Sequence, residues 1–180
     1  MEKRYAPNGV NVEGRKLVGV GVPYNKPARV VVNGRTVTER FMPGAFKRTL
    51  AERRDVLMLS DHDPSKVLGR TRSGSLRLHE APDGLRFEVD LPDTTAARDA
   101  LALAERGDTG GASVGFRATR ETWNADKTER TVIEADLLEV SVIASHPAYD
   151  TSVQARAQAT PEPLTARQRR LRLIEIGGAS

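Results

Sequence analysis

The stretch Val114–Ala144 (VGFRATRETWNADKTERTVIEADLLEVSVIA) decides the fold class, because it contains two long segments of strand character joined by a turn. Residues 114–123 and 130–144 are rich in β-branched and aromatic residues, whereas Asn124–Lys127 (NADK) is typical of a turn. We therefore expect these two segments to form long neighbouring strands.

Further strands are expected on the N-terminal side of this pair. They are short and separated by turn residues, and Asn33-Gly34 is the dipeptide most typical of a β-hairpin. The expected strands are residues 16–22, 29–32, 36–41, 56–59, 67–72, 75–80 and 85–91.

Two helices are expected between the strands. Pro43 suits the first position of one helix, which would end near Arg54. Asp93 or Thr94 can cap a second helix, which would run through Ala104 and close at the following Gly107. Many short strands with few helices predict a mixed α+β fold: a mostly antiparallel β-barrel, closed or nearly closed and surrounded by a few helices.

The chain of 180 residues is long enough for one domain with a core and a tail. We assign residues 1–153 to the barrel domain. Residues 155–163 (ARAQATPEP) have the composition of a flexible linker, and Leu164–Ile176 is a basic segment with apolar residues at helical spacing. Residues 154–180 are therefore expected to form a linker and a basic amphipathic tail.

Composition excludes several classes of function. The chain has no cysteine, which excludes disulfides, thiolate catalysis and zinc–thiolate sites. No apolar run is long enough to span a bilayer, and residues 1–10 lack the apolar region of a secretory signal, so we expect an intracellular protein without membrane contact. The net charge of +4 suggests nucleic-acid binding, but only 4% of the residues are aromatic, which leaves few platforms for base stacking. We do not expect nucleic acid as a partner.

Ser113 stands among small residues where a polar loop becomes an apolar strand, in Gly107–Phe116 (GDTGGASVGF). One interpretation is a turn with a structural hydroxyl. The other is a nucleophile whose surroundings admit a substrate backbone. The serine alone does not decide between them, because a nucleophilic serine also needs a base and a group that orients the base.

Histidine is the usual base for a serine nucleophile, and the chain has three. His79 ends a strand beside a charged turn, where we expect it at the surface. His146 precedes a proline after the last long strand. His62 follows a buried-looking strand and lies between Asp61 and Asp63, which is typical either of a capped turn or of a catalytic side chain at a strand end. We do not expect a metal site there, because adjacent ligands on an extended chain point in different directions.

Glu139 is the candidate for the orienting group, because it interrupts an otherwise apolar strand, Leu137–Ile143 (LLEVSVI). A carboxylate among leucine, valine and isoleucine is costly to bury unless it has a partner. The alternative is an edge strand on which Glu139 and Ser141 face water, since they alternate with apolar residues. The pattern alone favours this alternative.

These residues belong to a series of motifs that resembles the prohead proteases of tailed bacteriophages. The likeness runs from about Val18 to Tyr149. Its landmarks are Val20–Asn25 (VGVPYN), Glu39–Phe46 (ERFMPGAF), Leu59–Asp63 (LSDHD), Leu68–Arg70 (LGR), Asp83–Leu85 (DGL), Ala112–Phe116 (ASVGF), Leu138–Val142 (LEVSV) and Pro147–Tyr149 (PAY).

The resemblance implies roles for three residues. His62 matches the histidine of the Leu-x-x-His-Asp motif, and Ser113 matches the nucleophile of the Ser-x-Gly-Phe motif. Glu139, in the Glu-Val-Ser motif, is assigned as the third member, with His146 as its rival. The family is also similar to the herpesvirus assemblins, whose barrel carries a Ser-His-His triad with the third residue on the strand after the nucleophile.

The function that the resemblance implies is that of a serine endopeptidase, without cofactor or metal, that matures proheads. Its substrates and partners would be the major capsid protein, the scaffold region of that protein and the protease itself, and we also expect self-association. It would act in the host bacterial cytoplasm, inside the assembling prohead. Two other classes remain open: an inactive scaffold-binding virion protein and a basic nucleic-acid-binding module.

Overall fold

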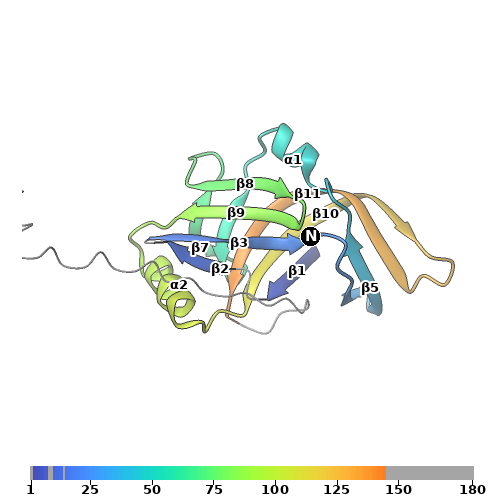
Figure 1. The fold of residues 1–180 in the computed structure, drawn as a ribbon, viewed down its shortest axis with the longest axis horizontal. Helices are drawn as coiled ribbons and strands as arrows, with labels where there is room; N and C mark the ends of the chain where they lie inside the picture. Colours follow the sequence, from blue (N-terminus) through green and yellow to red (C-terminus); the bar gives the residue numbers. More distant parts are fainter. Residues whose placement is uncertain (1, 8–9, 14, 145–180) are drawn as a thin grey trace, which may run out of the picture.

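The computed structural model describes residues 2–7, 10–13 and 15–144, which form two β-sheets and two helices (Figure 1). The mixed α+β class expected from the sequence is confirmed, with far more strand than helix. The tail at residues 154–180 and the rival histidine at position 146 lie outside the described residues. Within the described part, no helix is both long and apolar enough to cross a membrane.

The larger sheet is built around one long central strand, β11 (Glu129–Ile143). Its antiparallel neighbour β10 (Gly111–Trp123) pairs on its far side with β1 (Glu2–Pro7). Along its other edge, β11 pairs in parallel first with β5 (Arg35–Phe41) and then with β6 (Leu57–Ser60). Strands β4 (Ala28–Val32) and β7 (Asp63–Arg70) extend these two branches. The sheet therefore forks, and the end of β6 lies beside the C-terminal half of β11.

The smaller sheet has four antiparallel strands in the order β2-β3-β9-β8. Their bounds are Val10–Glu13 for β2, Lys16–Pro23 for β3, Gly84–Asp90 for β9 and Leu76–Ala81 for β8. Neither sheet closes into a barrel within the described residues, so the closed β-barrel expected from the sequence is not confirmed.

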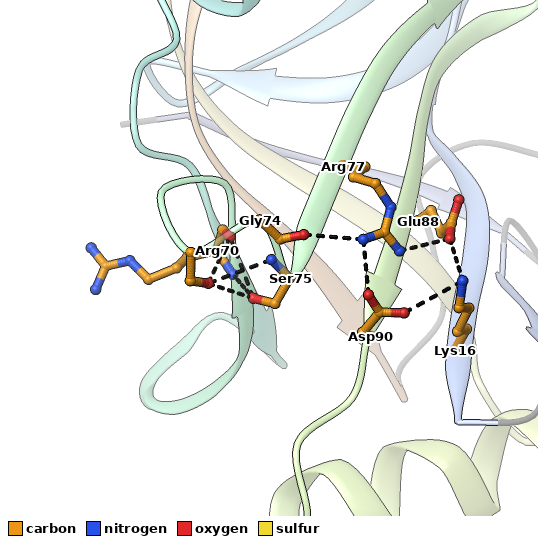
Figure 2. A network of polar contacts seen from close by, with 8 residues as sticks. Lys16, Arg70, Gly74, Ser75, Arg77, Glu88 and Asp90 are labelled. Carbon is orange, nitrogen blue, oxygen red and sulfur yellow. Dashed lines mark hydrogen bonds and ion pairs between the residues drawn. The ribbon is translucent and has the colours of Figure 1, made fainter.

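The outer face of the smaller sheet carries a network of alternating charges (Figure 2). Arg77 on β8 forms ion pairs with Glu88 at 2.6 Å and Asp90 at 2.8 Å on β9, and Lys16 on β3 lies 2.8 Å from Glu88. These hydrogen bonds hold the pKa of the Glu88 carboxyl below its ordinary value, Lys16 having the largest effect. Because residues alternate across a strand, the apolar neighbours of these charges face the other way and are buried: Leu17, Leu76, Phe87 and Val89.

The two helices lie far apart, α1 at the top of the view and α2 at the lower left (Figure 1). Helix α2 (Thr95–Arg106) begins and ends as expected: the Thr94 hydroxyl accepts a hydrogen bond from the N–H of Ala97, and Gly107 closes the helix in the left-handed conformation. Helix α1 (Lys47–Ala51) is much shorter than the expected helix from Pro43 to Arg54. Gly44 explains the later start, because its φ of 85° breaks the helical backbone immediately after the proline, and Arg53, with a φ of 49°, keeps the helix from reaching Arg54.

A β-bulge at Leu138 shifts the side-chain alternation of β11 by one residue. Glu139 pairs with Gly115, but the next pair is Leu137 with Phe116, so Leu138 is skipped in the register. Leu137 and Phe116 therefore face the apolar core, where both are buried. Glu139 faces the opposite side of the sheet, although it is only two residues further along the chain.

The parallel pairing of β5 with β11 contains a buried ion pair. Arg130 and Glu39 are partners in the strand register, and Arg130 Nη1 lies 2.9 Å from a carboxylate oxygen of Glu39. Their side chains are 3% and 0% exposed. Glu121 of β10 binds the same guanidinium, and the ring of Trp123 lies 5.7 Å from it. Arg130 thus joins three strands at the end of the sheet that lies far from β6.

We expect Arg130→Ala to lower the free energy of unfolding by about 3–5 kcal/mol, because it removes the cation that faces a fully buried carboxylate. Urea denaturation measures the loss. The control is Arg40→Ala, which breaks an exposed pair with Glu129 and should cost about 1 kcal/mol or less. If the two variants lose similar free energies of unfolding, the buried ion pair does not stabilise the fold more than the exposed one.

Candidate active site

His62 lies in the two-residue turn that connects β6 to β7. Ser60 and Asp63 pair across the turn, and both central residues have positive φ, 50° for Asp61 and 59° for His62. Two positive φ values are what a tight type I′ hairpin turn requires, and glycine or asparagine usually occupies such positions. A histidine there is unfavourable, so other contacts have to hold it in place.

One of these contacts is a short hydrogen bond between His62 and Glu139 of β11. The distance from His62 Nδ1 to a Glu139 carboxylate oxygen is 2.5 Å, and the Ser141 hydroxyl lies 3.3 Å from the same nitrogen. The side chains of His62 and Glu139 are only 7% and 8% exposed. A carboxylate at Nδ1 fixes that nitrogen as the N–H donor and leaves Nε2 as the nitrogen that can take up a proton.

Ser113 of β10 lies beside this pair. It is fully buried, it pairs with Ser141 in the strand register, and it contacts His62. Its hydroxyl has no hydrogen-bond partner among the described residues. A buried hydroxyl next to an imidazole and carrying no structural hydrogen bond is more typical of a reactive group than of a turn.

The shift in β11 explains why these side chains meet. Glu139 and Ser141 are two residues apart on β11, and Ser113 stands opposite Ser141, so all three face the same side of the sheet. The turn after β6 supplies His62 from the neighbouring parallel strand. A hydroxyl, an imidazole and a carboxylate in this order are the groups that nucleophilic acyl transfer uses.

Gly115 makes room for the Glu139 side chain. A Cβ atom built on Gly115 would lie 2.5 Å from Glu139 Cγ and 2.9 Å from its carboxylate oxygen, closer than real atoms approach. The carboxylate therefore lies across the β10 backbone at a residue that has no side chain. The presence of glycine at this position of the Ser-x-Gly-Phe motif is therefore explained by the space that the Glu139 side chain occupies, and not by backbone flexibility.

The structure corrects the edge-strand alternative for β11. That alternative placed Glu139 and Ser141 in water, but β11 is central in its sheet and the two residues are 6% and 0% exposed. Sequence reasoning missed the proximity of Ser141 to His62, although its spacing of two residues from Glu139 already predicts a shared face. His79 is exposed on β8, as expected, and does not take part in the site.

Comparison with known proteins gives a family match over most of the chain. A family model described as caudovirus prohead serine protease matches residues 8–163. The matched region contains Ser113, His62 and Glu139, together with every described strand from β2 onward. A search of curated proteins found no match, and a search of solved structures found none either.

We expect Gly115→Ala to break the hydrogen bond between His62 and Glu139 while the protein still folds. The added methyl group meets a flexible side chain that can move away, so the stability loss should stay below about 3 kcal/mol. Proton NMR measures the hydrogen bond through the downfield signal of the His62 Nδ1 proton, and thermal unfolding measures stability.

The matched control is Gly21→Ala. Its methyl group would meet Val114 and Val140, on the opposite face of the same two strands, at an ordinary contact distance of 3.5 Å. This variant should keep the downfield signal. Loss of the signal in both variants, or in neither, would contradict a specific role for the missing side chain at Gly115.

Proposed function

The chain belongs to the caudovirus prohead serine protease family, and from this we propose that it is a peptidase with Ser113 as nucleophile, His62 as general base and Glu139 as the group that orients the base. The observation that carries the proposal is the position of His62, which hydrogen-bonds Glu139 through Nδ1 and also contacts Ser113. Membership in the family makes the protein a hydrolase of capsid maturation.

In the proposed reaction, His62 Nε2 takes the hydroxyl proton as Ser113 Oγ attacks a peptide carbonyl carbon. The tetrahedral intermediate collapses when the imidazolium returns this proton to the leaving amine. A water molecule then attacks the acyl-enzyme in the same way and frees the acid product. Glu139 holds the Nδ1 proton throughout and stabilises the imidazolium that forms twice in each cycle.

The resting site is closed to solvent. Ser113 and Ser141 are 0% exposed, and a reacting carbonyl must come within about 3–3.5 Å of Ser113 Oγ. Substrate binding therefore has to open the structure around β10. A closed site suits an enzyme that shares a compartment with large amounts of other protein, because premature cleavage of that protein is limited.

We further propose the substrates and partners expected from the sequence: the scaffold region of the major capsid protein, and the protease itself at its linker. A protease that acts in the assembling capsid inside the host cell must contact capsid or scaffold protein. Self-association is part of the same proposal. We also propose that the two sheets form a nearly closed, assemblin-like barrel, and the contacts of β3 with β1 and β10 support this proposal.

The nucleophile is tested with Ser113→Ala and Ser141→Ala. Ser113→Ala should fold normally, fail to cleave co-expressed scaffold protein and keep its own full mass on incubation, because the acyl-enzyme cannot form. Ser141→Ala removes a hydroxyl 3.3 Å from His62 and should slow cleavage less than about tenfold. Intact-mass measurement of the scaffold protein and of the protease detects cleavage of the scaffold and self-cleavage, respectively. If Ser113→Ala cleaves near the wild-type rate, Ser113 is not the nucleophile.

The orienting group is tested with Glu139→Gln. This change keeps the shape of the side chain but removes the charge that stabilises the imidazolium, so we expect a rate loss on the order of 10⁴-fold. A peptide-cleavage assay measures the rate. His146→Ala serves as the comparison and should have a much smaller effect; the reverse ranking would transfer the orienting role to His146.

A further inference from the structure

The turn that carries His62 has a second attachment to β11, made by Asp61. The N–H of Asp61 donates to the carbonyl of Val142 at 2.8 Å, and a carboxylate oxygen of Asp61 accepts from the N–H of Ala144 at 2.9 Å. Ser60, the preceding residue, is the last of β6 to pair with β11, and its partner is also Val142. Asp61 thus continues the strand ladder past its end, with its side chain in place of a backbone carbonyl.

This attachment opposes a real conformational cost. Residues with a Cβ atom disfavour the left-handed region, although aspartate and histidine tolerate it better than most, and the turn places two such residues there in succession. A turn of this kind relaxes unless its surroundings hold it. Relaxation would carry the imidazole of His62 away from Glu139, because the ring is attached to the strained residue itself.

The two aspartates that flank His62 differ in where their carboxylates bind. The carboxylate of Asp63 accepts from the N–H and the hydroxyl of Ser65, at 2.9 Å and 2.7 Å, and so stays on its own strand β7. Of these two carboxylates, only that of Asp61 reaches β11 in the contacts that the structure describes. Asp63 therefore caps the turn locally, whereas Asp61 links the turn to a neighbouring strand.

We propose that Asp61 is a positioning residue for His62: by accepting the Ala144 N–H it pins the strained turn to the strand that carries Glu139 and Ser141. The inference rests on the proposed role of His62 as the base. It assigns the effect to the acceptor oxygen and not to the charge. Asparagine should therefore replace Asp61 well, because its amide oxygen accepts the same hydrogen bond and its backbone tolerates positive φ.

The test compares Asp61→Asn, Asp61→Ala and Asp61→Gly with the wild type. Glycine removes the acceptor but adopts positive φ freely, so it separates the lost hydrogen bond from backbone strain. The probe is a fluorophosphonate: Ser113 Oγ attacks phosphorus, fluoride leaves, and His62 takes the proton. We expect the maximal labelling rate to fall on the order of 10²-fold in the alanine and glycine variants, with little change in the half-saturating probe concentration. The asparagine variant should label at a rate within about threefold of the wild type, because its amide oxygen accepts the same hydrogen bond.

A second readout does not depend on activity. The downfield Nδ1 proton signal of His62 should persist in Asp61→Asn and weaken or vanish in Asp61→Ala and Asp61→Gly. The matched control is Asp83→Ala. Asp83 lies in the loop between β8 and β9, where its side chain pairs with Arg86, and this variant should match the wild type in both measurements.

Three results would overturn the inference. The first is a glycine variant with the labelling rate and the downfield signal of the wild type. This result would show that the hydrogen bond to Ala144 is not needed once the backbone strain is relieved. The second is an asparagine variant as slow as alanine, which would make the charge decisive. The third is an unchanged downfield signal in all Asp61 variants. If the wild type is neither labelled nor able to cleave scaffold protein, the proposed function fails, and the NMR series still decides whether Asp61 positions His62.

Discussion

A carboxylate buried in the middle of a β-sheet needs a partner, and the candidate site depends on how Glu139 meets this requirement. The residue lies on the central strand of the larger sheet with 6% of its surface exposed. Its partner is not another residue of β10 or β11 but the imidazole of His62, brought in by the neighbouring parallel strand. The cost of burying the charge is thereby offset by the interaction that orients the imidazole.

The same arrangement ties local strain to the site. The turn after β6 holds two successive residues in the left-handed region. It is attached to β11 through the side chain of His62, which binds Glu139, and through the backbone and carboxylate of Asp61, which bind the end of the strand. Gly115 contributes by having no side chain where the Glu139 carboxylate lies. The position of the imidazole is therefore determined from two sides, which is the precision that proton transfer between side chains requires.

Much of the strand pattern could be predicted from the sequence, because alternation of apolar and polar residues is a local property. Strands β9 and β11 begin one residue before the expected segments, and the caps of α2 are the expected Thr94 and Gly107. The prediction of the first helix failed because a single residue overrode the local pattern, and strands β1 and β2 were not predicted at all. Gly44, with its positive φ, shortens the first helix, and the bulge at Leu138 changes which face of β11 the following residues occupy.

Most of the elements, the family motifs and the residue types of the site could be read from the sequence, since these depend on near neighbours along the chain. The sequence did not determine whether Glu139 faces water or the protein interior; the alternation of residues favoured water. The answer came from the pairing of the strands, because burial depends on which strands lie on either side of β11. Two strands distant in sequence, β5 and β6, pair with its other edge, make it central and place His62 beside Glu139.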